Sequence, residues 1–204
     1  SEPPFVATYE YDGSSWTNGG NMSETRRNAV GFGTQTAGTA VAGRNMPPAA
    51  IISATEEYNG SSWTGGGNIT TAKAAAAGAG TQTAGLFFGG GFPIVTNTEE
   101  YDGSSWTSGG ALTTARRYLG GAGIQTAALA FGGSTPPGKT NVTEQYDGSS
   151  WTNTTSMSTT RDKLAGAGTT SAGLGFGGYT DPGRSTATEE FTAGSPTTVT
   201  LSGS

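Results

Sequence analysis

The chain has 204 residues, of which 36 are Gly and 32% are hydrophobic, and it contains neither Cys nor His. Without Cys and His it cannot form disulfides, thiolate nucleophiles, zinc fingers or Ser-His-Asp triads. Ten Lys and Arg against 15 Asp and Glu give a net charge of −5, so the chain lacks the basic surface that nucleic acids require.

The first predicted element is a hairpin in the stretch EYDGSSWT at residues 10–17. One strand covers Val6 to Tyr11 and the next carries Trp16, with a turn between them. Asp-Gly favours a type I′ turn, which needs positive φ at both central residues. The stretch returns three times, as EYNGSSWT at 57–64, EYDGSSWT at 100–107 and QYDGSSWT at 145–152. The hairpin is therefore one part of a repeat.

The segment after each Trp keeps a fixed length. The four Trp lie 43 to 47 residues apart, a spacing typical of repeat folds. Ten residues after them stand Arg26, Lys73, Arg116 and Arg161. Glycines follow 17 and 27 residues after each Trp, at 33, 80, 123 and 168 and then at 43, 90, 133 and 178. This constant register indicates one repeated structural unit.

Two strands are predicted inside each unit, here described for the second one. They cover Ala74 to Gly80 and Gly85 to Gly90, with a turn at Thr81 to Thr83. The sequence KAAAA at 73–77 favours a helix by propensity, but the same register holds RRYLG in the next unit. Gly and Thr recur throughout and disfavour helix, so we expect a strand.

All length variation falls between the second register Gly and the next aromatic residue. These segments are 11 to 15 residues long, share little sequence and carry prolines such as Pro47, Pro93, Pro136 and Pro182. No run of about 18 apolar residues occurs, so we expect no membrane-spanning segment. The variable segments are predicted to be surface loops.

The order of basic residue, small-residue strand, hydrophobic strand ending in Gly-Gly, variable loop, Tyr, turn and Trp resembles the kelch repeat. The phrase EYDGSSWT followed by GAGTQTAGL and FGG is similar to kelch-like repeats in proteins of marine bacteriophages. The resemblance covers Phe5 to Leu201 and departs in the first unit, which has Val41-Ala42-Gly43 in place of Phe-Gly-Gly.

The kelch resemblance implies an all-β propeller of about four four-stranded blades in one domain. The domain covers residues 1–204, with repeat units at 5–51, 52–94, 95–139 and 140–184 and a partial unit at 185–204. If the strands of a blade are lettered a to d from the axis outward, both Val6 to Tyr11 and Thr186 to Phe191 are c strands.

We expect the N-terminal d strand around Ser15 to Thr17 to close the ring by completing the last blade, because closure protects sheet edges. Thr197 to Leu201 is a further candidate for the final d strand. Since one c strand is in surplus, the alternatives are a fifth, shared blade or strand exchange with a neighbouring subunit.

The repeated motif allows two interpretations. Asp and two Ser could form a fourfold ligand site, or they could stabilise a turn while Trp16, Trp63, Trp106 and Trp151 pack in the structure. Turn chemistry accounts for these residues, and one carboxylate per turn is too few for calcium. We expect a structural role, with no metal and no cofactor.

The Glu pairs at 56–57, 99–100 and 189–190 are candidates for catalytic carboxylates. Adjacent strand residues point to opposite faces, so the two Glu cannot flank one bond. We expect one Glu of each pair to meet the basic residue of the same or the next blade. Copper-radical oxidase chemistry, which the kelch resemblance raises, requires Cys and His ligands. The protein is therefore not expected to be an enzyme.

The basic residues Arg26, Lys73, Arg116 and Arg161 have an alternative role as a cationic ring for an anionic glycan. Structural pairing is the preferred role, with an Arg in each blade acting as a clip between blades. The loops joining b to c and d to a are predicted to share one end of the ring. Candidate binding residues there are Arg44, Asn45, Met46, Phe92, Ile94, Lys139, Tyr179, Asp181 and Arg184.

Phe92 and Tyr179 have side chains suited to stacking on a sugar or entering a protein pocket, although all the loop candidates could be ordinary surface residues. The function expected from the sequence is non-enzymatic recognition of a cell-surface glycan or protein, at the cell exterior or on a virion. The alternative is a purely architectural phage tail, fibre or capsid-decoration protein. Expected partners are that surface ligand or other virion proteins, with homo-oligomers as a further option and no nucleic acid or membrane insertion.

Overall fold

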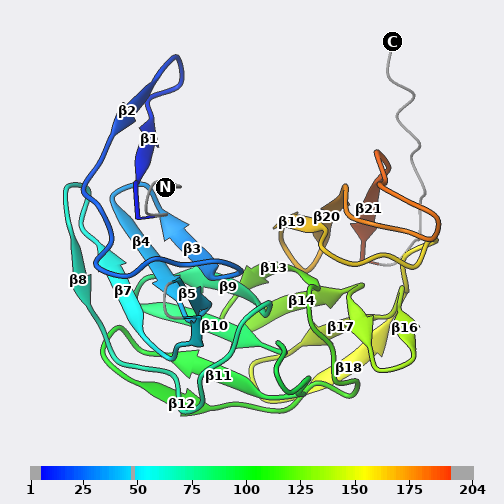
Figure 1. Ribbon diagram of the computed structural model, residues 1–204. Helices are drawn as coiled ribbons and strands as arrows, with labels where there is room; N and C mark the ends of the chain where they lie inside the picture. The colour runs from blue at the N-terminus through cyan, green and yellow to red at the C-terminus, as the bar shows by residue number, and fades with distance from the viewer. Residues whose placement is uncertain (1–5, 47–48, 194–204) are drawn as a thin grey trace.

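The computed structural model describes residues 6–46 and 49–193, and within these residues every regular element is a β-strand (Figure 1). No helix that could cross a membrane occurs in this part of the chain. The strand expected at Thr197 to Leu201 lies outside the described residues.

Three four-stranded antiparallel sheets and one three-stranded sheet follow one another along the chain. We call them blades 1 to 4. Blade 1 contains β3 (Val30–Thr34), β4 (Ala37–Val41), β7 (Thr55–Tyr58) and β8 (Trp63–Gly65). Blade 2 contains β9 (Ala77–Thr81), β10 (Ala84–Phe88), β11 (Thr98–Tyr101) and β12 (Trp106–Ser108). Blade 3 contains β13 (Gly120–Ile124), β14 (Ala127–Phe131), β17 (Thr143–Tyr146) and β18 (Trp151–Thr154). Blade 4 contains β19 (Ala165–Gly168), β20 (Ala172–Phe176) and β21 (Thr188–Thr192).

Three smaller hairpins complete the described structure. The N-terminal hairpin consists of β1 (Tyr9–Tyr11) and β2 (Trp16–Asn18). Two hairpins that the sequence does not predict lie inside variable loops: β5 (Arg44–Asn45) with β6 (Ala50–Ile51), and β15 (Ser134–Thr135) with β16 (Gly138–Lys139).

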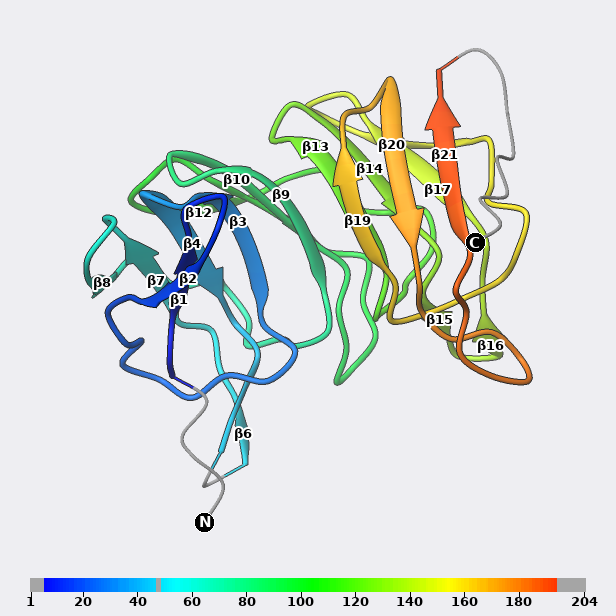
Figure 2. The same ribbon diagram turned by 90° about the horizontal axis from the view of Figure 1, so that it is seen from above.

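The blades are arranged as a β-propeller. Their innermost strands pack in the order β3, β9, β13, β19, and the two views show the sheets fanned around a common axis (Figures 1 and 2). The expectation of a four-bladed all-β propeller is therefore confirmed. The N-terminal hairpin and blade 4 lie at opposite ends of an open arc (Figure 1).

The N-terminal hairpin takes the place of a blade before blade 1. The hydroxyl of Tyr58 donates to Glu10, and the indole nitrogen of Trp63 donates to Thr8 at 2.8 Å. Because β2 pairs with β1 and the hairpin is tied to blade 1, it does not complete blade 4. The prediction that the N-terminal d strand closes the ring by completing blade 4 is therefore wrong for the described residues.

Thin, interlocking surfaces form the core between blades. Phe88, Leu119 and Trp151 belong to one buried cluster, together with several alanines. A Cβ added to Gly121 would lie 2.8 Å from the ring of Phe88, which leaves no room for a side chain. Small residues on one blade therefore let large residues of the next approach the backbone, as the composition predicts.

One hydrogen-bond pattern recurs at the outer part of the blade interfaces. The hydroxyls of Tyr101 and Tyr146 donate to Glu57 and Glu100 of the preceding blade at 2.5 and 2.6 Å. Burial, with a contribution from the carboxylate, raises the pKa of Tyr101 to about 12, and that of Tyr146 likewise. The indole nitrogens donate in the same way, from Trp106 to Thr55 at 3.0 Å and from Trp151 to Thr98 at 2.9 Å.

The Glu at the second position of the third strand forms an ion pair inside its own blade, in all four blades. Lys73 lies 2.9 Å from Glu99, and Arg116 lies 2.7 Å from Glu144. Arg26 with Glu56 and Arg161 with Glu189 repeat this arrangement. The side chains lie inside the blades, so they neither form a cationic ring nor clip one blade to the next. The inter-blade role expected for Arg is wrong because the connection entering a blade runs beside that blade's own third strand.

Ala42 adopts a left-handed backbone conformation, and the equivalent position in each of the other blades is a Gly. Its φ is 59°, and the equivalent Gly132 has φ 62°. An L-residue in this region is strained by about 1–2 kcal/mol. A Cβ at Gly132 would also lie 2.7 Å from the carbonyl oxygen of Arg161.

The substitution Ala42→Gly is therefore expected to raise the free energy of unfolding by about 0.5–1 kcal/mol, since relief of strain exceeds the added chain entropy. The matched change Gly132→Ala should lower it by more than this. Urea unfolding followed by fluorescence measures both. A loss of stability in Ala42→Gly would contradict the assigned strain.

Candidate recognition surface

The two ends of the blades differ in construction. Backbone bridges join Arg27 to Arg44, Ala74 to Gly91, Arg117 to Ser134 and Asp162 to Tyr179. They place the connections entering the blades (residues 19–29, 66–76, 109–119 and 155–164) beside the loops after the second strands (42–54, 89–97, 132–142 and 177–187). We call this the loop end. The two classes of loop lie at the same end of the blades, as the sequence predicts.

The opposite end, the turn end, carries the GSS turns of the repeated motif. One carboxylate oxygen of Asp102 accepts from the backbone N–H groups of Ser104 and Ser105, both at 2.8 Å, and the other accepts from the Ser105 hydroxyl at 3.0 Å. These bonds lower the pKa of Asp102 to about 2. Asp12, Asn59 and Asp147 repeat the pattern.

The turn in this motif is not the expected type I′ turn. The hairpin loop has four residues, since Tyr101 pairs with Trp106. Gly103 has φ 93°, whereas Asp102 is not among the residues with positive φ. The Asp side chain, by capping two backbone N–H groups, stabilises the longer loop. The motif thus has the construction of a scaffold.

A concavity of about 460 Å³ opens near the propeller axis. It is lined by the same register position of every blade, Asn28, Ala75, Tyr118 and Lys163, and by the residues that follow them. These four residues have φ between 53° and 59°. Backbone N–H groups of Ala75, Tyr118 and Lys163 donate to the carbonyl of the preceding member at 2.6 to 2.9 Å, so the backbone fixes their positions around the axis.

Aromatic and cationic side chains alternate beside this concavity. We call Phe92, Arg117, Tyr118, Lys163 and Tyr179 the aromatic–cation row. The Arg117 guanidinium lies 4.9 Å from the Phe92 ring centroid and 5.4 Å from that of Tyr118. The Lys163 ammonium lies 5.3 Å from the Tyr118 centroid and 5.1 Å from that of Tyr179. Phe92 and Tyr179 keep 45% and 39% of their surface exposed.

Charge is unevenly distributed between the two ends. Four of the ten basic residues are in the buried ion pairs. The other six all belong to the loop end: Arg27, Arg44, Arg117, Lys139, Lys163 and Arg184. Acidic residues of the loop end are Glu24, Asp162 and Asp181, whereas Asp12, Asp102 and Asp147 lie in the turns of the turn end. An acidic chain therefore presents a net basic loop end.

The structure brings together only part of the predicted loop set. Phe92 contacts Arg117 and Tyr179 contacts Lys163, and both of these cations contact Tyr118. Separately, Lys139 lies 2.6 Å from Asp181 of the next loop. That carboxylate raises the pKa of Lys139.

The first loop is tied to its own connection and does not reach the row through any contact described. Asn45 donates to Glu24 at 2.5 Å, and the backbone of Met46 donates to Thr25 at 2.9 Å. Arg44 and Arg184 are exposed, while Ile94 is half-buried.

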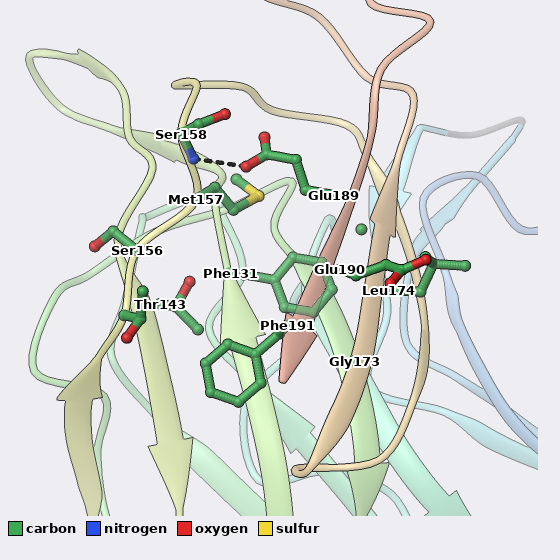
Figure 3. Close-up of a pocket in the computed structure, with 12 residues that line it drawn as sticks. Phe131, Thr143, Ser156, Met157, Ser158, Gly173, Leu174, Glu189, Glu190 and Phe191 are labelled. Atoms are coloured by element: carbon green, nitrogen blue, oxygen red, sulfur yellow. Dashed lines mark hydrogen bonds between the residues drawn. The ribbon is translucent and has the colours of Figure 1, made fainter. Parts of the chain in front are cut away.

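A second, smaller cavity of about 120 Å³ lies between blades 3 and 4 (Figure 3). Phe131, Thr143, Met157 and Phe191 line it. Thr143 stands at the register of Thr55 and Thr98, which accept the Trp indoles at the preceding interfaces. Glu189 of this cavity already binds Arg161 and the Ser158 backbone N–H, so its carboxylate is used structurally.

Among the residues the structure describes, no cluster of three or more Asp, Glu, His or Cys could hold a metal ion. Comparison with models of known protein families gave no match, and comparison with curated proteins gave none either.

Proposed function

We propose that this protein is a non-enzymatic recognition module that binds an acidic cell-surface glycan through its loop end. The observation that carries the proposal is the aromatic–cation row beside the axial concavity. Exposed aromatic faces bury the apolar face of a sugar ring, and Arg and Lys bind carboxylate or sulfate groups. The net basic loop end would attract such a polyanion despite the acidic chain.

Two further features support recognition rather than catalysis. Within the pairs, Glu56, Glu99 and Glu189 bind basic residues, and Glu57 and Glu100 accept from Tyr hydroxyls. Glu190 lies on the face of β21 opposite to Glu189, so the two carboxylates cannot flank one bond. The row residues stand on loops of variable length over a rigid propeller, the usual location of binding residues. The kelch-like and marine-phage resemblance of the repeats supports an extracellular or virion-associated location, such as a phage tail fibre used in host attachment.

The proposal is tested by screening the protein against acidic and neutral surface polysaccharides and measuring affinity over a range of salt concentrations. We expect binding to uronic-acid or sulfated polymers that weakens as salt rises. Tyr179→Ala and Lys163→Ala should each weaken binding about tenfold, corresponding to loss of one stacking or ionic contact.

Ile124→Ala is the matched control, because Ile124 is an exposed apolar side chain at the turn end. It should leave affinity unchanged. Equal binding of neutral polymers, no binding to any glycan, or an equal loss in Ile124→Ala would contradict the proposal.

An architectural role is the second candidate. It is favoured by the exposed aromatic face of the N-terminal hairpin, where Trp16 is 68% exposed although its equivalents Trp106 and Trp151 are buried.

A further inference from the structure

The interfaces inside the propeller use two complementary faces. One face presents Thr and Glu two residues apart on the third strand of a blade, as in Thr55 and Glu57. The following blade presents Tyr and Trp from its outer hairpin, as in Tyr101 and Trp106, which donate to that Glu and that Thr. The same contact, made by four residues through two hydrogen bonds, joins blade 3 to blade 2 and blade 1 to the N-terminal hairpin.

The donor face is left open at the start of the arc. Tyr11 and Trp16 are cross-strand partners, so they share one face of the N-terminal hairpin. Glu10, on the opposite face, contacts blade 1. Tyr11 and Trp16 therefore point away from blade 1, with ring centroids 5.1 Å apart and with 48% and 68% of their surface exposed.

The acceptor face is left open at the other end of the arc. Thr188 pairs with Phe176 and Glu190 with Leu174 across β20 and β21. A Cβ added to Gly173 would lie 2.7 Å from Leu129 of blade 3, so this face of β20 is turned toward blade 3. Leu174, the next residue, lies on the other face of β20, the face that Thr188 and Glu190 share. Thr188 and Glu190 therefore face away from blade 3. They stand at the register of Thr55 and Glu57, and no described residue donates a hydrogen bond to the side chain of either.

We propose that a second copy of this chain docks its N-terminal hairpin on blade 4, so that the Trp16 indole donates to Thr188 and the Tyr11 hydroxyl donates to Glu190. The occupant is a second copy because one chain carries both halves of a contact that it already makes three times internally. The hairpin of the same chain cannot serve, since it is bonded to blade 1 at the opposite end of the arc (Figure 1).

This contact joins two different faces and is therefore head-to-tail, which builds rings or open chains of copies rather than a symmetric dimer. The hairpin supplies two strands, so the contact is smaller than an interface between full blades. Small interfaces are typically weak, and we expect association at concentrations of roughly 10–100 µM. The inference goes beyond the proposed glycan recognition, which uses the loop end.

Sedimentation velocity over a concentration series tests the contact. The unmodified chain should associate reversibly, and Trp16→Ala should remain monomeric at the same concentrations. Thr188→Val combined with Glu190→Gln should also remain monomeric. All three substitutions are at surface positions, so folding is expected to be retained and is checked by circular dichroism.

Mixing the two monomeric variants tests the head-to-tail geometry. Trp16→Ala keeps an intact acceptor face, and the Thr188→Val/Glu190→Gln variant keeps an intact donor face. The mixture should form dimers and nothing larger, although each variant alone is monomeric. A mixture that stays monomeric while the unmodified chain associates would overturn the proposed pairing.

Tyr179→Ala is the matched control, because it removes an exposed aromatic side chain of the loop end. It should associate like the unmodified chain but lose glycan affinity, whereas Trp16→Ala should lose association and keep glycan affinity. Failure of either proposal is thus visible independently of the other. A monomeric unmodified chain throughout the series, or association that persists in Trp16→Ala, would overturn the inference.

Discussion

Arg116→Ala is expected to lower the free energy of unfolding by about 3–5 kcal/mol, because it leaves the buried Glu144 carboxylate without its partner. Both side chains have no exposed surface. Arg116 also donates to the carbonyl oxygens of Ala130, Gly132 and Val142. A loss of this size is a large fraction of the stability of a single domain. Urea unfolding followed by circular dichroism measures the loss.

The chain offers a natural control in blade 2, where Lys73 occupies the same register and bonds Glu99 through its ammonium. Arg116→Lys keeps the charge and loses donors to the carbonyls, so we expect a smaller loss of about 1–2 kcal/mol. Arg116→Met with Glu144→Leu should recover much of the stability lost in Arg116→Ala, since no unpaired charge remains. A loss below about 1 kcal/mol in Arg116→Ala would show that the ion pair does not hold the blade together.

Trp151→Ala is expected to lower the free energy of unfolding by about 3–5 kcal/mol. Trp151 is 4% exposed, packs on Tyr146 and Phe88 and donates to the buried Thr98 hydroxyl. Removing the indole leaves a cavity and a buried polar atom without a partner. Thermal or urea unfolding at low protein concentration provides the measurement.

Trp16→Ala changes the same residue of the same motif, yet it should alter stability by less than about 0.5 kcal/mol, as for other surface substitutions. The two variants change the same residue of the repeated motif, so a difference in their loss of stability reports the different burial of the two Trp side chains. Equal losses in the two variants would contradict the placement of the N-terminal hairpin at an open end of the arc.

The sequence predicts the propeller well because Trp sets a constant register. The glycines 17 residues after each Trp show why the register holds: Gly80 has φ 109°, and a Cβ there would lie 2.2 Å from the carbonyl oxygen of Ala84. Any other residue would strain that turn. Repeats that share such positions must share strand lengths.

The ends of the arc could not be predicted in the same way. Register assigns β1 and β21 the same place in a blade and does not say which neighbour each contacts. The contact is decided by Tyr58 and Trp63 of blade 1, which bind the N-terminal hairpin. At the other interfaces a Tyr hydroxyl donates to a Glu of the preceding blade. Between blades 3 and 4 the Glu is replaced by Gln145 and the Tyr by Phe191, so this hydrogen bond is absent there.

The proposed recognition surface can be predicted only in part from the sequence. Phe92 and Tyr179 are aromatic residues in variable loops, and that alone indicates exposure. Arg117, Tyr118 and Lys163 were missed because they follow the structural basic residue within the segment of constant length. Their signal is the variation at these two positions among the units, from Arg27-Asn28 to Ala74-Ala75, Arg117-Tyr118 and Asp162-Lys163. Constant length with changing side chains indicates a fixed backbone that presents different groups.

The repeated motif forms the turns of the scaffold, and we propose that recognition occurs at the opposite end of the blades. Amide hydrogen exchange with and without a bound uronic-acid oligosaccharide tests it most directly. From this proposal we expect protection in residues 89–97, 115–119, 161–164 and 177–187, and none in the turns at 12–15, 59–62, 102–105 and 147–150. Protection confined to those turns would contradict it.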